Sequence, residues 1–362
     1  MSSYEEALLA AADEAGAAWV QGEQGWVAFG EPRPLRAWSD LDRDGAWFIA
    51  LPYGFPQEPG RAWDLSAASS YPLAGASMLE PPRALSCSAA WDGEGHRARV
   101  RAAQAAIAAG EVYQLNLGCT WRIALAPHPC PDVALHLALR ARDPAPYACL
   151  LRGGAGPAIV GNSPELFLAV RDGVATMRPI KGTRRRRRGE EAAVRAELAA
   201  SEKERAELAM IVDLCRHDLG RVAVPGGVRV DDPGSVVDLP HLHHRLAQVS
   251  ARLRPGTPLS AVIAACFPAG SITGAPKRAA MRHIAALEGA SRGHWCGAYG
   301  RLAGGGCELA VAIRTVEIAG ATLWLRAGGG IVADSDPAQE WQEARDKARA
   351  VAEVLGLPWE ER

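Results

Sequence analysis

The chain has 362 residues, 48% of them hydrophobic, so it is long enough to bury one large core or two intertwined ones. Its net charge of −1 argues against nucleic acid or an acidic membrane surface as a partner. Eight cysteines are scattered singly without a CxxC pair, and no stretch reaches the roughly 18 apolar residues of a membrane-spanning helix. We therefore expect a soluble cytoplasmic protein with free thiols.

Short strand-like runs broken by turn residues fill residues 1–90, which are rich in Trp, Pro and Gly. The pattern changes near residue 90, where RARVRAAQAAIAAG predicts a helix that ends at a glycine. Strand and helix patterns alternate from there. The clearest strands are ELFLAV (165–170), VATMRPI (174–180), AVAIRTVEI (310–318) and ATLWLRA (321–327), and the clearest helices span 201–215 and 336–355. We expect an α+β protein in which a strand-rich segment, 1–90, packs on one unit spanning 91–362.

Both of these helices are predicted to turn carboxylates toward the core. In the first, Glu204 and Glu207 flank its apolar stripe, and Glu340 and Glu343 repeat that spacing in the second. A buried carboxylate needs a cation, and two such pairs facing each other would make an all-oxygen site suited to Mg²⁺. The alternative is two solvated helices, with Glu204 in a capping box and Glu343 in an ordinary i,i+4 pair with Lys347.

Two cations stand out from their surroundings. Only four of the 40 basic residues are lysines, and one of them, Lys181, precedes an arginine run at 184–188. Lysine is unusual at this position in a chain that uses mostly arginine. Of the two residues, only lysine can be deprotonated at tolerable cost to act as a nucleophile or base. Arg314 shares a strand face with apolar residues in AVAIRTVEI, so we expect an anion beside it, most simply a ligand carboxylate. The arginine run itself is expected to be a solvated loop.

Seven motifs, taken in order, resemble the chorismate-utilising enzymes over about residues 91–350. They are EVYQLNL (111–117), NSPELFL (162–168), RPIKGT (178–183), AELAMIVDLCRHDLGRV (206–222), GSITGAPKRAAM (270–281), AVAIRT (310–315) and GGGIVADSDPAQEWQEARDKA (328–348). Within this family the chain is most similar to component I of the aminodeoxychorismate synthases, siblings of the anthranilate synthases. The resemblance implies a two-sheet α/β sandwich flanked by helices, Mg²⁺ as cofactor and chorismate as substrate.

The resemblance also assigns binding roles residue by residue. It implies that Glu207 and Glu343 ligate Mg²⁺, with Glu204 and Glu340 beside them, and that the metal holds the ring carboxylate of chorismate.

For the substrate, it implies that Arg314 binds the pyruvyl carboxylate. Trp295 lies nearby, and backbone N–H groups of Gly328 and Gly330 point to the same carboxylate. Thr273 lies by the ring carboxylate.

The implied chemistry uses Glu165 as the general acid for the departing C4 hydroxyl, with His244 close to that hydroxyl. Such an acid needs a raised pKa, which burial in an apolar pocket supplies. Isochorismate synthases activate water with a lysine where this chain has Gln114, and an amide cannot act as that base. The resemblance implies that Lys181 adds to C2 of the ring, and that ammonia then attacks C4 and expels the lysine.

These roles predict conversion of chorismate and ammonia to 4-amino-4-deoxychorismate, for 4-aminobenzoate and folate biosynthesis. No glutaminase motif is present, so we expect a separate glutamine amidotransferase to supply the ammonia. The alternative enzyme is anthranilate synthase component I, which differs by its aromatic product and released pyruvate. A third hypothesis, from another class, is a nucleic-acid-binding or scaffold protein that uses the arginine run, which predicts steeply salt-dependent binding.

Overall fold

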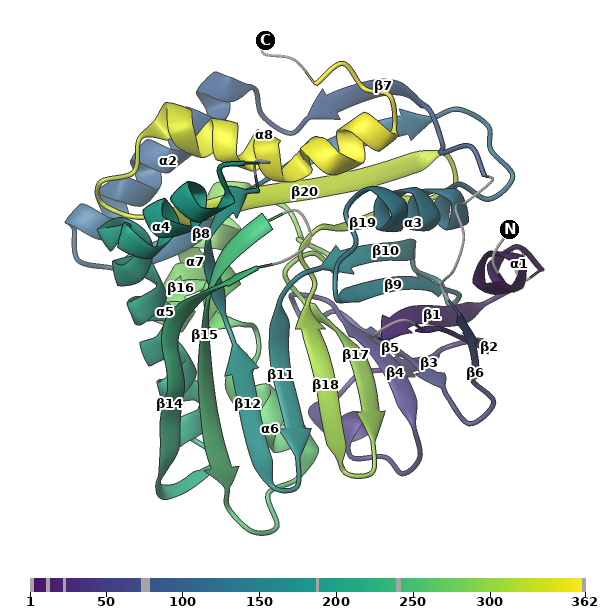
Figure 1. The fold of residues 1–362 in the computed structure, drawn as a ribbon, viewed down its shortest axis with the longest axis horizontal. Coiled ribbons are helices and arrows are strands. Elements are labelled where there is room, and N and C mark those ends of the chain that lie inside the picture. The colour runs from purple at the N-terminus through teal and green to yellow at the C-terminus, as the bar shows by residue number, and fades with distance from the viewer. Residues whose placement is uncertain are drawn as a thin grey trace.

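The computed structural model describes residues 3–10, 14–21, 24–72, 79–186, 189–238 and 242–359. In these residues two antiparallel sheets of ten strands each form a sandwich, with helices on the outside (Figure 1). The predicted α+β class and two-sheet architecture are confirmed.

The first sheet runs from an edge at β16 to the N-terminal strands. Its order is β16 (Gly274–Ala275), β8 (Gln114–Leu125), β20 (Thr322–Ile331), β19 (Thr315–Ala319), β10 (Ala158–Ser163), β9 (Tyr147–Arg152), β1 (Gly16–Gln21), β2 (Gln24–Phe29) and β6 (Ser69–Pro72), and β7 (Ala84–Ala89) also pairs with β8.

The second sheet has its edge at β13, the strand that carries Lys181. Its order is β13 (Ile180–Arg185), β15 (Leu242–Leu253), β12 (Val174–Arg178), β11 (Leu166–Arg171), β18 (Gly306–Val311), β17 (Ala298–Ala303), β4 (Trp47–Leu51), β5 (Gly60–Asp64) and β3 (Arg33–Leu35), and β14 (Ala223–Asp238) also pairs with β15.

Helices cover the outer faces of both sheets. They are α1 (Ser3–Ala10), α2 (Gly93–Ala108), α3 (Pro131–Arg142), α4 (Glu191–Ala200), α5 (Glu202–Gly220), α6 (Leu259–Cys266), α7 (Lys277–Glu288) and α8 (Pro337–Val354), with short 3-10 turns η1 (Trp38–Leu41) and η2 (Gly270–Ile272). Helix α8 lies along β20, and α5 lies across β14 and β15 (Figure 1). The two acidic pairs therefore lie on helices that pack against different sheets.

Local signals set the starts of these two helices. The Ser201 hydroxyl accepts a hydrogen bond from the Glu204 N–H at 3.4 Å, as expected of a helix N-cap. At α8 the Asp336 carboxylate accepts from the N–H groups of Ala338 and Gln339, and Pro337 occupies the first turn. Both predicted helix starts are confirmed.

The predicted strand over 310–318 is wrong at its centre. Strand β18 ends at Val311 in the second sheet, and β19 begins at Thr315 in the first, so the chain changes sheets between them. Arg314 lies in this crossing with a φ of +47°, a conformation that is uncommon for residues other than glycine. Alternation of apolar residues continues through 310–318, and therefore the pattern does not reveal the crossing.

The segment 1–90 contributes strands to both sheets. Strand β1 pairs with β9, and β4, a fully buried run at Trp47–Leu51, pairs with β17. Between the sheets, Trp19 and Phe48 pack in one core with Tyr299. The domain boundary near residue 90 stays a prediction.

No helix in the described ranges is long and apolar enough to cross a membrane. All eight cysteines are free thiols, as predicted, and all except Cys87 are buried.

Candidate active site

The residues expected to carry the chemistry gather at one end of the sandwich, where β13 of the second sheet meets β8 and β20 of the first. Gly330 marks the meeting point. A Cβ atom at this position would lie 2.8 Å from Lys181 Nζ and 2.5 Å from Gln114 Nε2. A side chain here would displace the ends of both side chains, so the glycine leaves space in which the lysine amine and the Gln114 amide lie close to the same point. The Gln114 carbonyl Oε1 is buried and has no hydrogen-bond partner in the described residues.

Lys181 is held by a carboxylate of α5. Its amine lies 3.2 Å from Glu207 Oε2, and both side chains are largely buried, at 15% and 12% exposed. Burial opposes the charge on the amine, but Glu207 and Glu343, together with Glu204, outweigh it and raise the pKa of Lys181. The lysine is therefore an ammonium ion in this arrangement.

The second acidic residue of α5 has a different partner. Glu204 Oε1 lies 3.3 Å from an Nη1 atom of Arg184, the first arginine of the run. Arg184 also pairs with Glu197 of α4 at 3.0 Å. The expectation of a solvated loop is therefore wrong for Arg184, which belongs to β13 and neutralises a site carboxylate. Residues 187 and 188 of the run lie outside the described residues.

Helix α8 presents its acidic pair from the other side. Glu340 is buried, and its Oε1 accepts a hydrogen bond from the Ser335 hydroxyl at 2.7 Å. Its Oε2 has no hydrogen-bond partner among the described residues, and burial raises the pKa of Glu340. Glu343 is half-exposed rather than turned to the core, and it forms the i,i+4 pair with Lys347, at 2.6 Å, that the alternative of solvated helices predicts. Lys347 also donates to the Gly328 carbonyl. Lys347 lowers the pKa of Glu343.

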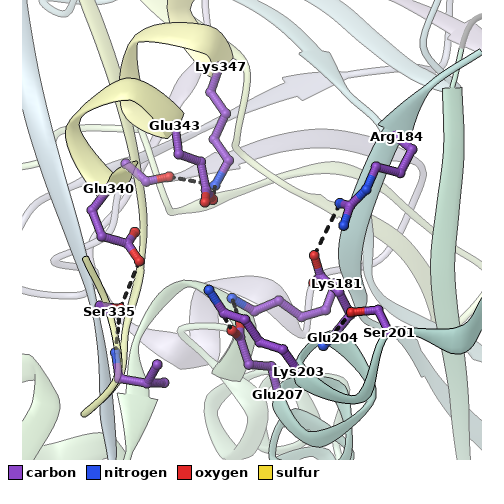
Figure 2. Close-up of polar contacts among 12 residues, drawn as sticks. Lys181, Arg184, Ser201, Lys203, Glu204, Glu207, Ser335, Glu340, Glu343 and Lys347 are labelled. Atoms are coloured by element: carbon purple, nitrogen blue, oxygen red, sulfur yellow. Dashed lines mark hydrogen bonds and ion pairs between the residues drawn. The ribbon is translucent and has the colours of Figure 1, made fainter. Parts of the chain in front are cut away.

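Figure 2 shows the two acidic pairs on opposite sides of one opening, with lysine amines beside Glu207 and Glu343. Within the described part of the chain, no three His, Cys, Asp or Glu side chains lie close enough together to hold a metal ion. Mg²⁺ would therefore have to draw the carboxylates together and away from the amines. The role of these four residues as a metal site stays a prediction.

Glu165 is a buried carboxylic acid at the start of β11. Burial raises the pKa of Glu165 to about 7, although a hydrogen bond from Ser271 Oγ at 2.6 Å and the charge of Lys181 partly oppose this rise. The carboxyl group is therefore about half protonated at neutral pH, which suits proton donation.

His244 is buried near this end of the sandwich, and the partly exposed Arg314 lies close enough to affect its charge. Strand pairing places His244 opposite Thr183. Burial, together with the charge of Arg314, lowers the pKa of His244 to about 4, so its imidazole is neutral at physiological pH. The anion expected beside Arg314 is present, but it belongs to the protein: the guanidinium lies 2.9 Å from the Asp143 carboxylate.

Trp295 and Thr273 are packed rather than exposed. The Trp295 ring lies against Gly118, where a Cβ atom would come within 2.3 Å of it, and the Arg292 guanidinium lies 4.9 Å from its centre. The Thr273 hydroxyl donates to the Ala269 carbonyl at 2.9 Å, so its proton is already used.

Sequence reasoning missed four partners in this region: Arg184, Ser271, Ser335 and Asp143. Ser271 lies inside the GSITGAPK motif, which could have drawn attention to it. Asp143 follows α3 and is 171 residues from Arg314, and no local pattern connects the two.

Comparison with known proteins identifies the family of this chain. A family model described as chorismate binding enzyme matches residues 46–353. The chain belongs to the chorismate-binding enzymes. Among relatives of this family, anthranilate synthase component 1 of Mycobacterium tuberculosis is 41% identical over 266 residues, covering 70% of this chain and 51% of the relative. The aminodeoxychorismate synthase of Streptomyces griseus is 38% identical over 319 residues, covering 85% and 44%.

The chain spans about half the length of these curated relatives. Two solved structures of chorismate-binding enzymes share its fold. The menaquinone-specific isochorismate synthase of Escherichia coli superposes with a TM-score of 0.84 at 20% identity, covering 98% of this chain and 91% of the other. Anthranilate synthase component I of Streptococcus pneumoniae superposes with a TM-score of 0.73 at 23% identity, covering 93% and 90%.

Proposed function

We propose that this chorismate-binding enzyme is component I of an aminodeoxychorismate synthase, which converts chorismate and ammonia to 4-amino-4-deoxychorismate for 4-aminobenzoate and folate synthesis. The observation that carries the proposal is the Lys181 amine, which is buried beside Glu207, Gln114 and Gly330. A lysine that served only as a charge would be exchangeable with arginine, whereas a buried primary amine among the site residues can form a covalent bond to the ring.

In the proposed reaction the neutral Lys181 amine adds to C2 of chorismate as the C4–oxygen bond breaks. Glu165 gives its proton to the departing hydroxyl, which leaves as water. Ammonia then adds to C4, the bond between Lys181 and C2 breaks, and the double bond returns to its place. Because its carboxylate neighbours keep Lys181 charged, the amine must release a proton before it adds.

The carboxylates have the donor chemistry of the Mg²⁺ ion that the family resemblance implies, although the described residues do not gather three of them around one point. Glu207 and Glu343 offer the oxygen ligands that Mg²⁺ prefers, and the buried Oε2 of Glu340 has no partner in the described chain. When bound, Mg²⁺ would hold the ring carboxylate of chorismate and offset its charge. Arg314 is the candidate for the second carboxylate of the substrate, which would compete with Asp143 for the guanidinium.

Gln114 supports ammonia rather than water as the second reactant. Its neutral amide cannot deprotonate water, whereas ammonia is a stronger nucleophile than water and adds without a base. We propose that a separate glutamine amidotransferase delivers this ammonia.

Anthranilate synthase is the competing function, because most of the named relatives carry that name. Incubation with chorismate, Mg²⁺ and ammonium separates the two. The proposal expects a non-aromatic amino acid that retains the enolpyruvyl group, identified by mass spectrometry, and no pyruvate in a lactate dehydrogenase assay. Stoichiometric pyruvate and fluorescent anthranilate would overturn it.

A further inference from the structure

A bulge in β13 brings Lys181 and Arg184 to the same helix. In a regular strand, residues three apart point to opposite faces. The pairing of β13 with β15 shifts between Lys181 and Thr183, so Gly182 is an extra residue there. Its φ of +77° lies in the left-handed region that favours glycine. Both cations consequently face α5.

Two ion pairs then connect the strand to the helix. The i,i+3 spacing of Glu204 and Glu207 places both carboxylates on one face of α5. Arg184 pairs with Glu204 at 3.3 Å, and Lys181 pairs with Glu207 at 3.2 Å. A Cβ atom at Gly182 would lie 3.0 Å from Glu204 Oε2, so this carboxylate is packed directly over the glycine. Glu204 and Glu207 are therefore held by two different cations of β13.

We propose that Arg184 is a positioning residue that holds the Glu204 carboxylate away from the metal position, leaving Glu207 as the α5 carboxylate that faces Glu343. In Figure 2 the Glu204 carboxylate points to Arg184, whereas that of Glu207 lies beside Lys181. Mg²⁺ is usually bound through one or two carboxylates and keeps its other positions for water and substrate. A further protein carboxylate would fill a position that chorismate needs. This inference rests on the Mg²⁺ site of the proposed function.

The chain offers a matched control within the same arginine run. The Arg184 side chain is 33% exposed and also pairs with Glu197 of α4 at 3.0 Å. Arg186 is exposed and carries the same charge two residues further along. Replacing each with glutamine removes equal charge and similar volume, so the comparison isolates the contacts of Arg184 with Glu197 and Glu204, and replacement of Glu204 then separates these two.

Loss of Arg184 should strengthen the binding of Mg²⁺ and weaken the binding of chorismate. Arg184→Gln releases Glu204 and removes one positive charge, so the chorismate-free protein should bind Mg²⁺ about fivefold more tightly. Because the freed carboxylate occupies a position meant for substrate, KM for chorismate should rise and kcat should fall. A merely structural loss of folding would weaken both kinds of binding.

The experiment is a calorimetric Mg²⁺ titration of the full chain without chorismate. It compares wild type, Arg184→Gln, Arg186→Gln, Glu204→Gln and the Arg184→Gln/Glu204→Gln double variant. We expect Arg186→Gln to stay within about twofold of wild type, and the effect of Arg184→Gln to fall to the same small size once Glu204 is replaced, because only the loss of charge then remains.

Three results would overturn the inference: equal Mg²⁺ affinities for Arg184→Gln and Arg186→Gln, an Arg184→Gln effect that persists undiminished without Glu204, or a wild-type protein that binds no Mg²⁺. Product analysis of the wild type is separate. If the product is anthranilate, the proposed function is wrong, whereas the positioning role of Arg184 is decided by the titrations alone.

Discussion

The Lys181 amine lies 3.2 Å from the Glu207 carboxylate, and this ion pair joins the edge strand of one sheet to the helix that covers it. Glu207 also lies 4.0 Å from Lys203, so the proposed Mg²⁺ would compete with two lysines for this carboxylate. Changes at Glu207 should therefore affect metal binding and the chemistry of Lys181 together.

Glu207→Gln removes a charge from this position at almost constant volume. We expect turnover at limiting Mg²⁺ to fall more than about 100-fold with the fold intact, because a neutral amide is a poor ligand for a hard cation. Glu343→Gln should behave alike. Glu202→Gln is the control, since Glu202 lies on the same helix with its side chain 88% exposed. Activity is measured at limiting Mg²⁺, and circular dichroism spectra check the fold. Full activity of Glu207→Gln would show that Glu207 is not a metal ligand.

Gly182→Ala should damage the site as well as the fold. The φ of +77° costs alanine roughly 1 kcal/mol, and the new methyl group would press on the Glu204 carboxylate. Gly173→Ala is the matched control, because Gly173 has a φ of +72° and open space around its Cβ position. In urea, Gly182→Ala should lose at least as much unfolding free energy as Gly173→Ala, and only Gly182→Ala should lose activity, by about 10-fold or more. Equal activities would show that the bulge does not position the site.

The rate should depend on the protonation of Glu165. A general acid works only when protonated, and burial raises the pKa of Glu165 to about 7. The same step needs a neutral Lys181 amine, whose fraction grows with pH because the pKa of Lys181 is raised. We therefore expect kcat/KM to rise with pH up to about 7 and to level off above it, where the loss of protonated Glu165 cancels the gain in neutral lysine. The hydrogen bond from Ser271 lowers the pKa of Glu165, so Ser271→Ala should move this break to higher pH. A break that stays in place in Ser271→Ala would assign it to another group.

The same carboxyl should make folding stability depend on pH. The pKa of Glu165 is raised from 4.5 in the unfolded chain to about 7 in the folded protein. Its favourable contribution is therefore complete below 4.5 and is lost as pH rises through about 7. Glu165→Gln, which stays neutral, should exceed wild-type stability at pH 8 by on the order of 2–3 kcal/mol and match it near pH 5. Urea unfolding at the two pH values checks this, and an equal difference at both would contradict it.

Sequence patterns predicted the features that depend on near neighbours. The caps at Ser201 and Asp336 were recognised because capping acts within one helical turn. The inward direction of Glu204 and Glu207 followed from helical periodicity and is confirmed by their burial.

The remaining features depend on tertiary contacts that no local pattern contains. The change of sheet before Arg314 preserves the alternation of apolar residues, and its ionic partner Asp143 comes from a distant helix end. In the sequence, Arg184 is one of five arginines that no pattern distinguishes. The bulge at Gly182, which directs Arg184 toward α5, is visible only in the structure.

Lys181→Arg tests whether the lysine acts as more than a charge. Arginine preserves the positive charge beside Glu207 but is not deprotonated at usable pH, so we expect almost no turnover. Lys181→Ala should also lose most activity, and direct attack of ammonia at C2 should give a trace of anthranilate. Wild-type rates for Lys181→Arg in the product assay would show that the lysine is incidental.

Mass spectrometry can show directly whether Lys181 bonds covalently to the substrate ring. The protein is incubated with chorismate and Mg²⁺ but without ammonia. With no ammonia to expel the lysine, the adduct should persist. We expect the peptide carrying Lys181 to gain the mass of chorismate minus one water, and the corresponding peptide of Lys181→Arg to gain no mass. An unmodified Lys181 peptide from protein that aminates chorismate when ammonium is supplied would contradict it.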